Sequence, residues 1–230
     1  SLSEGGTLDL SGFSGAVNLQ GTNQSDTLIG NDDDNIIRVL SDEKTGNGLG
    51  VDTVSAGGGD DTILWNTRQY EDWSDFFSSA NNDTQTYIIE GDVDGGAGND
   101  ELVLSFGHTI PYAPSLDSNY QNYDWYHAWG GNTWNNEGAE DVYSVDLSTL
   151  ALTNVDVVSA VGYEAGGSWK FPAKFIFSNA QLTDLTSLNG FKAISIVGGG
   201  TLDLSHVASL TSATWTIGDG EAYTIVGTSL

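Results

Sequence analysis

Five nine-residue segments of the chain repeat one arrangement of glycine, acidic and aliphatic residues. Each opens with a glycine-rich or polar stretch, has Asp or Asn at its sixth position and Leu, Ile or Val at its eighth. This spacing alternates a tight turn with a short strand, and such repetition is typical of a parallel β-roll that binds calcium. The segments are residues 21–29, 30–38, 47–55, 56–64 and 95–103.

The residue types explain why this spacing suits calcium. Glycine allows the positive φ that a tight turn requires, and the aspartate adds a carboxylate beside the turn carbonyls. Calcium prefers six to eight oxygen ligands of these two kinds. Ordinary Gly-Asp turns would explain one copy, whereas five copies with four in tandem pairs favour calcium. The aliphatic residues should point inward and stack on the next coil: Leu28, Ile37, Val54, Ile63 and Leu102.

Alternating strands also flank the repeats. The segment TLDLS occurs at residues 7–11 and again at 201–205, which suggests the same coil type at both ends. Further strands are predicted at 142–147, 155–161, 174–177, 193–197, 214–217 and 223–226. We therefore predict an all-β fold, a right-handed parallel β-solenoid (β-roll or β-helix) with aromatic-rich loop insertions. A β-roll half beside a separate β-sandwich is the alternative.

The pattern predicts a single domain over residues 1–230 with two insertions. The calcium-binding coils cover 21–105 and contain an insertion at 66–85, where aromatic spacing predicts a short amphipathic helix. Residues 107–141 have no clear period and form a long aromatic loop, and 142–230 return to β coils without nonapeptides. Residues 162–171 are predicted to be a loop, and the spacing of Leu182, Leu185 and Leu188 suggests a helical turn or a tight corner.

Charge and composition narrow the function classes. Six Lys and Arg stand against 32 Asp and Glu, a net charge of −26, which excludes nucleic-acid binding and disfavours anionic membranes. No apolar run is long enough to span a membrane, so we expect a protein that is not membrane-inserted. The chain has no cysteine, so we expect several calcium ions to replace disulfides in an extracellular domain and to couple to folding. Its ends suggest flanking domains of a longer chain.

The segments GGAGNDELV (95–103) and AGGGDDTIL (56–64) resemble the calcium-binding repeats of RTX proteins, which Gram-negative bacteria export by type I secretion. The resemblance covers about a fifth of the chain and implies that sixth-position aspartates and glycine carbonyls of neighbouring coils share calcium ions. The second copy departs from the pattern, because Asn35 stands where aspartate belongs. The implied metal ligands are Asp26, Asp33, Asn35, Asp52, Gly57, Gly59, Asp61, Gly96, Gly98 and Asp100, with Asp92 and Asp94 as weaker additions.

The repeats fix fold and metal but leave the function to the remaining sequence. The loop at 107–141 combines seven Tyr and Trp residues with Asn and acidic residues, which suits a carbohydrate or a surface peptide. We expect a ligand-binding module of an RTX adhesin at the bacterial surface, without enzymatic activity. A polysaccharide lyase or epimerase on a β-helix and a structural or surface-layer segment are the alternatives. The candidate ligand contacts are Tyr112, Asp124, Trp125, Tyr126, His127, Trp129, Asn132 and Trp134.

Overall fold

The computed structural model describes most of the strands predicted from the sequence. The described residues are 1–22, 24–41, 50–67, 85–105, 143–161, 163–165, 168–170, 174–183, 185–191, 193–210, 214–217 and 220–227. Within them the chain is all-β apart from one 3-10 turn. The predicted loop at 107–141 and almost all of the insertion at 66–85, with its predicted helix, lie outside these residues.

Two parallel sheets contain the nonapeptide strands. Sheet I joins five strands in the order β1 (Thr7–Asp9), β3 (Thr27–Ile29), β5 (Asp52–Ser55), β8 (Gly91–Asp94) and β11 (Leu150–Thr153). Sheet II joins seven strands in the order β2 (Asn18–Gln20), β4 (Ile36–Ser41), β6 (Thr62–Thr67), β9 (Glu101–Ser105), β12 (Val157–Val161), β16 (Ser187–Asn189) and β19 (Ser209–Leu210). Sheet II therefore runs from the first strands into the C-terminal part without a break.

A third parallel sheet begins in the middle of the chain. Sheet III joins β7 (Gln85–Ile88), β10 (Tyr143–Asp146), β15 (Lys174–Ser178), β17 (Ala193–Val197) and β20 (Thr214–Ile217). At the C-terminal end, β18 (Gly200–Asp203) pairs in parallel with β21 (Tyr223–Val226). The prediction of a loop at 162–171 is wrong, because β13 (Tyr163–Ala165) and β14 (Ser168–Lys170) form an antiparallel hairpin there.

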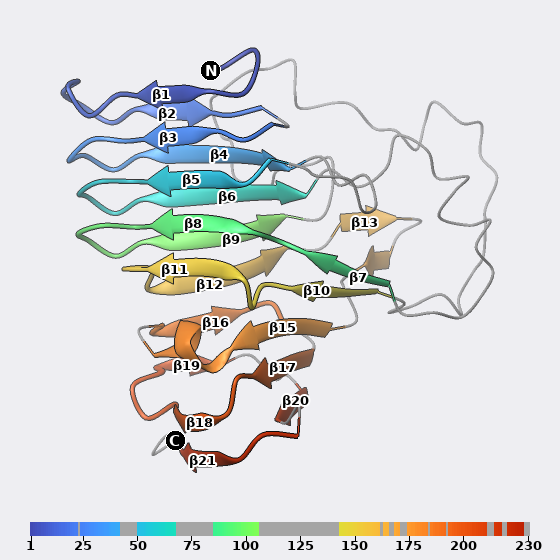
Figure 1. Cartoon of the computed structure of the whole chain (residues 1–230). Helices are drawn as coiled ribbons and strands as arrows, with labels where there is room; N and C mark the ends of the chain where they lie inside the picture. Colours follow the sequence, from blue (N-terminus) through green and yellow to red (C-terminus); the bar gives the residue numbers. More distant parts are fainter. Residues whose placement is uncertain are drawn as a thin grey trace.

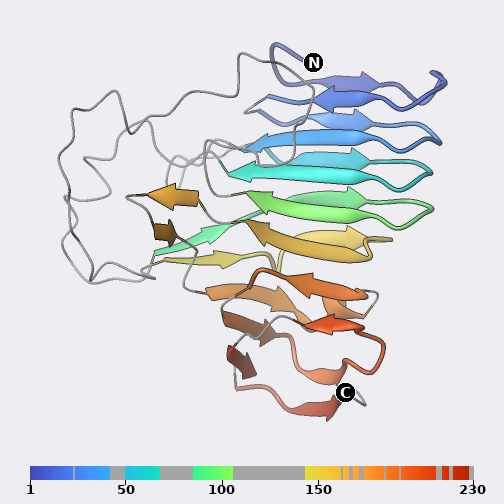
Figure 2. The ribbon, with the colours of Figure 1, turned by 180° about the vertical axis from the view of Figure 1, so that it is seen from behind.

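The chain visits the sheets in turn, so that successive passes lie one above another (Figure 1). We call each pass a rung. The first rungs alternate between sheets I and II, and from β7 onward a strand of sheet III is added. The view from behind shows the same order from the N-terminal to the C-terminal end (Figure 2). All six strands predicted after residue 142 are confirmed within a few residues of their predicted bounds.

The eighth-position aliphatic residues form the core as predicted. Leu28 pairs in register with Val54 in sheet I, and Ile37, Ile63 and Leu102 are aligned in sheet II. All five are no more than 1% exposed. Burying one such side chain contributes about 1.5–3 kcal/mol, so the periodic apolar positions hold the rungs together.

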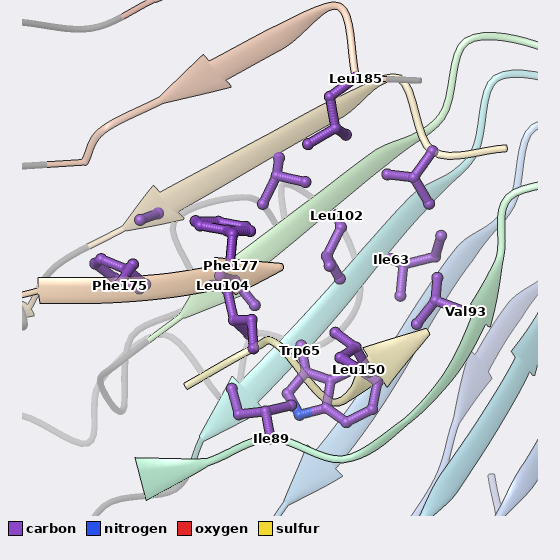
Figure 3. Close-up of a cluster of buried hydrophobic side chains, with 14 of the residues drawn as sticks. Ile63, Trp65, Ile89, Val93, Leu102, Leu104, Leu150, Phe175, Phe177 and Leu185 are labelled. Atoms are coloured by element: carbon purple, nitrogen blue, oxygen red, sulfur yellow. The ribbon is translucent and has the colours of Figure 1, made fainter. Parts of the chain in front are cut away.

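The core widens where sheet III enters. Phe175 and Phe177 of β15 are fully buried and lie near Leu104 and Trp65 of sheet II (Figure 3). Both phenylalanine rings meet Phe191 edge to face, at centroid distances of 4.7 and 5.5 Å. These large side chains fill the space that a third strand per rung creates.

A short 3-10 turn, η1 (Asn179–Leu182), takes the place of a sheet I strand between β15 and β16. It ends at Leu182, the first of the three leucines whose spacing suggested a helical turn. The buried Gln181 side chain donates from Nε2 to Leu147 O and Leu150 O, at 2.6 Å each. Gln181 therefore donates hydrogen bonds to main-chain carbonyls of the preceding rung, where η1 lies next to β11.

The two TLDLS segments adopt the same corner. Asp9 Oδ1 accepts the Ser11 main-chain N–H, and Asp203 Oδ1 accepts that of Ser205, both at 2.9 Å. In each segment the serine hydroxyl also donates to the aspartate. The hydrogen bonds from the hydroxyl and from the main-chain N–H lower the pKa of both aspartates. A third copy of the corner begins at Asp146, whose Oδ1 accepts the Ser148 N–H at 2.9 Å.

Candidate metal centre

The sixth-position residues stack into one row at the turns that lead into sheet II. Each main-chain N–H donates to the side chain of the residue one rung further along. Asn35 N donates to Asp61 Oδ1 at 2.7 Å, Asp61 N to Asp100 Oδ1 at 2.8 Å, and Asp100 N to Asp156 Oδ2 at 2.9 Å. We call Asn35, Asp61, Asp100 and Asp156 the inner row, in which one oxygen of each acidic side chain is fixed by the preceding rung.

The second carboxylate oxygen of two inner-row aspartates has no hydrogen-bond partner. Asp61 Oδ2 and Asp100 Oδ2 are buried and unpaired, and the two residues are 1% and 0% exposed. A buried polar oxygen without a donor is costly, and the cost is larger for a charged group. Each of these oxygens therefore needs a proton or a cation.

Asn35 shows what the unpaired oxygens face. Its Oδ1 accepts the Val17 N–H at 3.0 Å, and its Nδ2 donates to Asn31 O at 3.1 Å and Ala56 O at 3.2 Å. Where the aspartates place Oδ2, asparagine thus places an amide that bridges two carbonyls. Asp100 Oδ2 lies in the corresponding place beside Asn154 O and has no hydrogen-bond donor.

The first glycine of two repeats, Gly30 and Gly95, shows that the Asn35 and Asp100 side-chain atoms correspond. A Cβ on Gly30 would lie 2.1 Å from Ala56 O and 2.9 Å from Asn35 Nδ2. A Cβ on Gly95 would lie 2.2 Å from Asn154 O and 2.8 Å from Asp100 Oδ2. Asp100 Oδ2 therefore occupies the place of Asn35 Nδ2, and glycine leaves room for it in both repeats, whereas the repeat of Asp61 begins with Ala56.

The predicted glycine ligands form the stacked turns beside the inner row. Gly57, Gly59, Gly96 and Gly98 all have positive φ, between 96° and 146°. A Cβ on Gly96 or Gly98 would lie 1.8 Å from the carbonyl oxygen of Gly57 or Gly59, respectively. Gly57 O accepts the Ala97 N–H at 2.9 Å, which leaves its second lone pair available.

Asp26 and Asp52 form a second, shorter row at the turns that lead into sheet I. Asp26 N donates to Asp52 Oδ1 at 2.8 Å. Asp26 Oδ1 accepts a hydrogen bond from the Gly6 N–H. Asp26 Oδ2 accepts hydrogen bonds from the main-chain N–H and the hydroxyl of Thr22. Asp26 therefore already has donors for both oxygens, unlike Asp61 and Asp100.

Burial raises the pKa of three of these carboxyl groups. It raises the pKa of Asp52 to about 7, with a smaller contribution from the charge of Asp26. It raises the pKa of Asp61 to about 6, and the charges of Asp100 and Asp34 act in the same direction. The pKa of Asp100 is also raised, by burial first and then by neighbouring acids. Burial therefore disfavours the charged form of these three carboxyl groups unless a positive charge lies beside them.

An outer row of fifth-position residues lies beside the inner row and faces solvent. Asp60 N donates to Asp34 Oδ1 at 2.8 Å, and Asn99 N donates to Asp60 Oδ1 at 2.9 Å. These bonds run from a later rung to an earlier one, opposite to those of the inner row. The exposed carboxylates add negative charge close to the buried ones.

The remaining predicted ligands are dispersed. Asp33 is exposed, and its Oδ2 accepts the Gly15 N–H at 2.8 Å. Asp94 Oδ1 accepts from Asn154 Nδ2 at 2.8 Å, and Asp92 is exposed on sheet I. Over the described ranges, no group of three or more His, Cys, Asp or Glu side chains is placed to hold a metal ion. A cation here would have to take most of its ligands from main-chain carbonyls.

The sequence prediction missed Asp156 and Asn154. Asp156 stands two residues before Val158, which pairs with Leu102, just as Asp100 stands two residues before Leu102. The Asp-x-aliphatic spacing was therefore present without the glycines. Asn154 has a φ of 53°, a left-handed conformation that asparagine tolerates better than most residues.

The predicted ligand contacts at 107–141 lie outside the described residues: Tyr112, Asp124, Trp125, Tyr126, His127, Trp129, Asn132 and Trp134. Comparison of the chain with protein-family models, curated proteins and solved structures found no match. In the part of the chain that the structure describes, no helix is long and apolar enough to cross a membrane.

Proposed function

We propose that this chain is a right-handed parallel β-solenoid of the RTX type, that calcium links its rungs, and that it serves outside the cell as a ligand-binding module of a bacterial adhesin. The observation that carries the calcium proposal is the pair of buried, unpaired oxygens, Asp61 Oδ2 and Asp100 Oδ2. The stacked parallel strands support the solenoid, and crossovers between parallel strands are right-handed in nearly all proteins.

The available donor atoms fit a hard cation. The inner row offers carboxylate and carbonyl oxygens, and calcium accepts six to eight such ligands in flexible geometry. Magnesium requires a stricter octahedron and keeps several waters, which suits a carbonyl-rich turn less well. Asp61 and Asp100 would hold the ions together with the neighbouring turn carbonyls. The bound cation would supply the positive charge that these oxygens lack.

The net charge of −26 makes this cation important for folding. Self-repulsion opposes a compact state, and a cation that binds only the folded chain stabilises it by mass action. At a calcium concentration 100 times the Kd, one site contributes about 2.7 kcal/mol. Several such sites would give a chain that is rigid with calcium and loose without it.

Thermal unfolding tests the calcium proposal. We expect millimolar calcium to raise the melting temperature of chelator-treated protein by more than 10 °C, about what two sites at 100 times their Kd would give. Magnesium at the same concentration is the control and should have a much smaller effect. Equal melting temperatures in calcium and chelator would contradict the proposal.

The adhesin part of the proposal rests on the sequence of residues 107–141. Trp and Tyr rings stack on the apolar faces of sugars, while Asn and Asp side chains accept and donate hydrogen bonds to hydroxyls. A glycan array probed with and without chelator tests it, with Trp125→Ala and Trp129→Ala as variants. Binding that is unchanged in both variants would remove residues 107–141 as the ligand site.

A further inference from the structure

The inner row reaches one rung beyond the last nonapeptide. Asp100 belongs to the last repeat, but the next rung contributes residues 154–156, which have no glycine-rich turn. The inner row nevertheless continues there, because Asp100 N donates to Asp156 Oδ2. We call the contact between two consecutive rungs of the inner row a joint. The joint between these two rungs therefore has the same main-chain register as a joint between repeats.

The same atoms also converge at this joint. Gly95 N donates to Thr153 O, as Gly30 N donates to Ser55 O at the Asn35 joint. This register places Asn154 O where Ala56 O lies, and Asp100 Oδ2 faces it without a donor between them. A buried carboxylate oxygen opposite a carbonyl is an incomplete coordination site.

Neighbouring side chains strengthen the negative charge of the joint. Asp94 lies beside Asn154, whose Nδ2 it binds, and Asp156 lies beside Asp100. The left-handed conformation of Asn154 forms a short turn in the place where a repeat has its longer glycine-rich turn. This turn brings a carbonyl to Asp100 without any repeat motif.

We propose that Asp100 Oδ2 and the main-chain oxygen of Asn154 bind a divalent cation at the joint between the last repeat and the non-repeat rung. This inference rests on the proposed calcium function and adds a site that the nonapeptide pattern does not contain. The cation links the repeat rungs to the C-terminal rungs. At the Asn35 joint, by contrast, the amide already occupies the position and no cation is bound beside it.

Native mass spectrometry of the calcium-saturated chain tests the site by counting ions. Asp100→Asn places an amide opposite Asn154 O, as at Asn35, and should lose one ion. Asp61→Asn is the matched variant at a joint between repeats and should also lose one. Asp156→Asn removes the same charge but keeps an oxygen that can accept the Asp100 N–H, so it should retain every ion.

The outcomes separate this inference from the proposed function. A wild-type chain without bound calcium would overturn both. If Asp61→Asn loses one ion and Asp100→Asn loses none, only the site at Asn154 is wrong. Loss of an ion from Asp156→Asn would overturn the assignment of Asp100 and Asn154 as the ligands.

A measurement on the wild-type chain avoids dependence on the folding of a variant. Calcium should shift the ¹³C resonances of the Asp100 carboxyl and the Asn154 carbonyl together in a single titration. The Asn35 side-chain amide should shift little, because it already pairs with two carbonyls. Unchanged Asp100 and Asn154 resonances at saturating calcium would overturn the inference.

Discussion

Replacing Asp61 by asparagine should stabilise the calcium-free chain. Asp61 Oδ2 is buried and unpaired, and above its pKa of about 6 the carboxyl group is charged. Leaving such a group unsatisfied costs about 1–3 kcal/mol or more, and each new amide hydrogen bond returns about 0.5–1.5 kcal/mol. We therefore expect Asp61→Asn to gain at least about 2 kcal/mol at pH 8, or about 4–8 °C in melting temperature.

The stability advantage of Asp61→Asn over wild type should shrink or disappear in calcium. Wild type gains a bound ion at this joint, worth about 2.7 kcal/mol at 100 times its Kd, and Asp61→Asn does not. The calcium-induced rise in melting temperature should therefore be smaller for the variant than for wild type. Circular dichroism at the β-sheet minimum, recorded in chelator and in millimolar calcium, measures both differences.

Asp60→Asn is the control for charge alone. Asp60 is the exposed neighbour of Asp61 and accepts the Asn99 N–H through Oδ1, which an asparagine oxygen can also do. It should change the melting temperature by no more than about 1–2 °C, the shift from a surface substitution of about 0.5 kcal/mol. If Asp61→Asn gives no rise in chelator, or only the rise that Asp60→Asn gives, the reasoning about the unpaired oxygen is refuted.

Three further predictions follow from the same contacts. The pKa of Asp52 is raised to about 7 in the folded chain, above its ordinary 3.8, so the calcium-depleted protein should melt at a higher temperature at pH 5 than at pH 8. Asp52→Asn should narrow that difference, and an equal difference in wild type and variant would contradict the prediction. Gly96→Ala should destabilise by several kcal/mol more than Gly220→Ala, although both have φ near 95°, because only the first meets a carbonyl; similar denaturant midpoints would argue against this. Gln181→Leu removes the side-chain donor to Leu147 O and Leu150 O, of which Leu147 O keeps the Leu150 N–H, and should cost about 1–3 kcal/mol by urea unfolding, whereas an unchanged midpoint would show that water replaces the amide.

The stacking of the repeats could be predicted from the sequence because each repeat contains the residues that form its own turn and strand. The aliphatic at the eighth position and the glycines at positive φ serve the same purpose in each copy, as Ile63 and Leu102 or Gly57 and Gly96 show. One repeat therefore carries enough information to place its strand and its turn. The register between rungs follows because a slip would expose the aliphatic side chains.

The third sheet and the proposed site beyond the repeats could not be predicted in the same way. Sheet III depends on Phe175 and Phe177 filling a wider core, a contact between distant segments without a fixed period. Asp156 is placed by its pairing with Asp100 across 56 residues, which no local motif reports. Nor does the repeat pattern show that the Asn35 amide pairs with two main-chain carbonyls.

The most direct test of calcium between the rungs is anomalous diffraction from crystals grown in calcium. A difference map recorded at long wavelength should show a peak beside Asp61 Oδ2 and another beside Asp100 Oδ2, and none beside Asn35 Nδ2. The absence of peaks at both aspartates, with the oxygens still buried, would contradict the account.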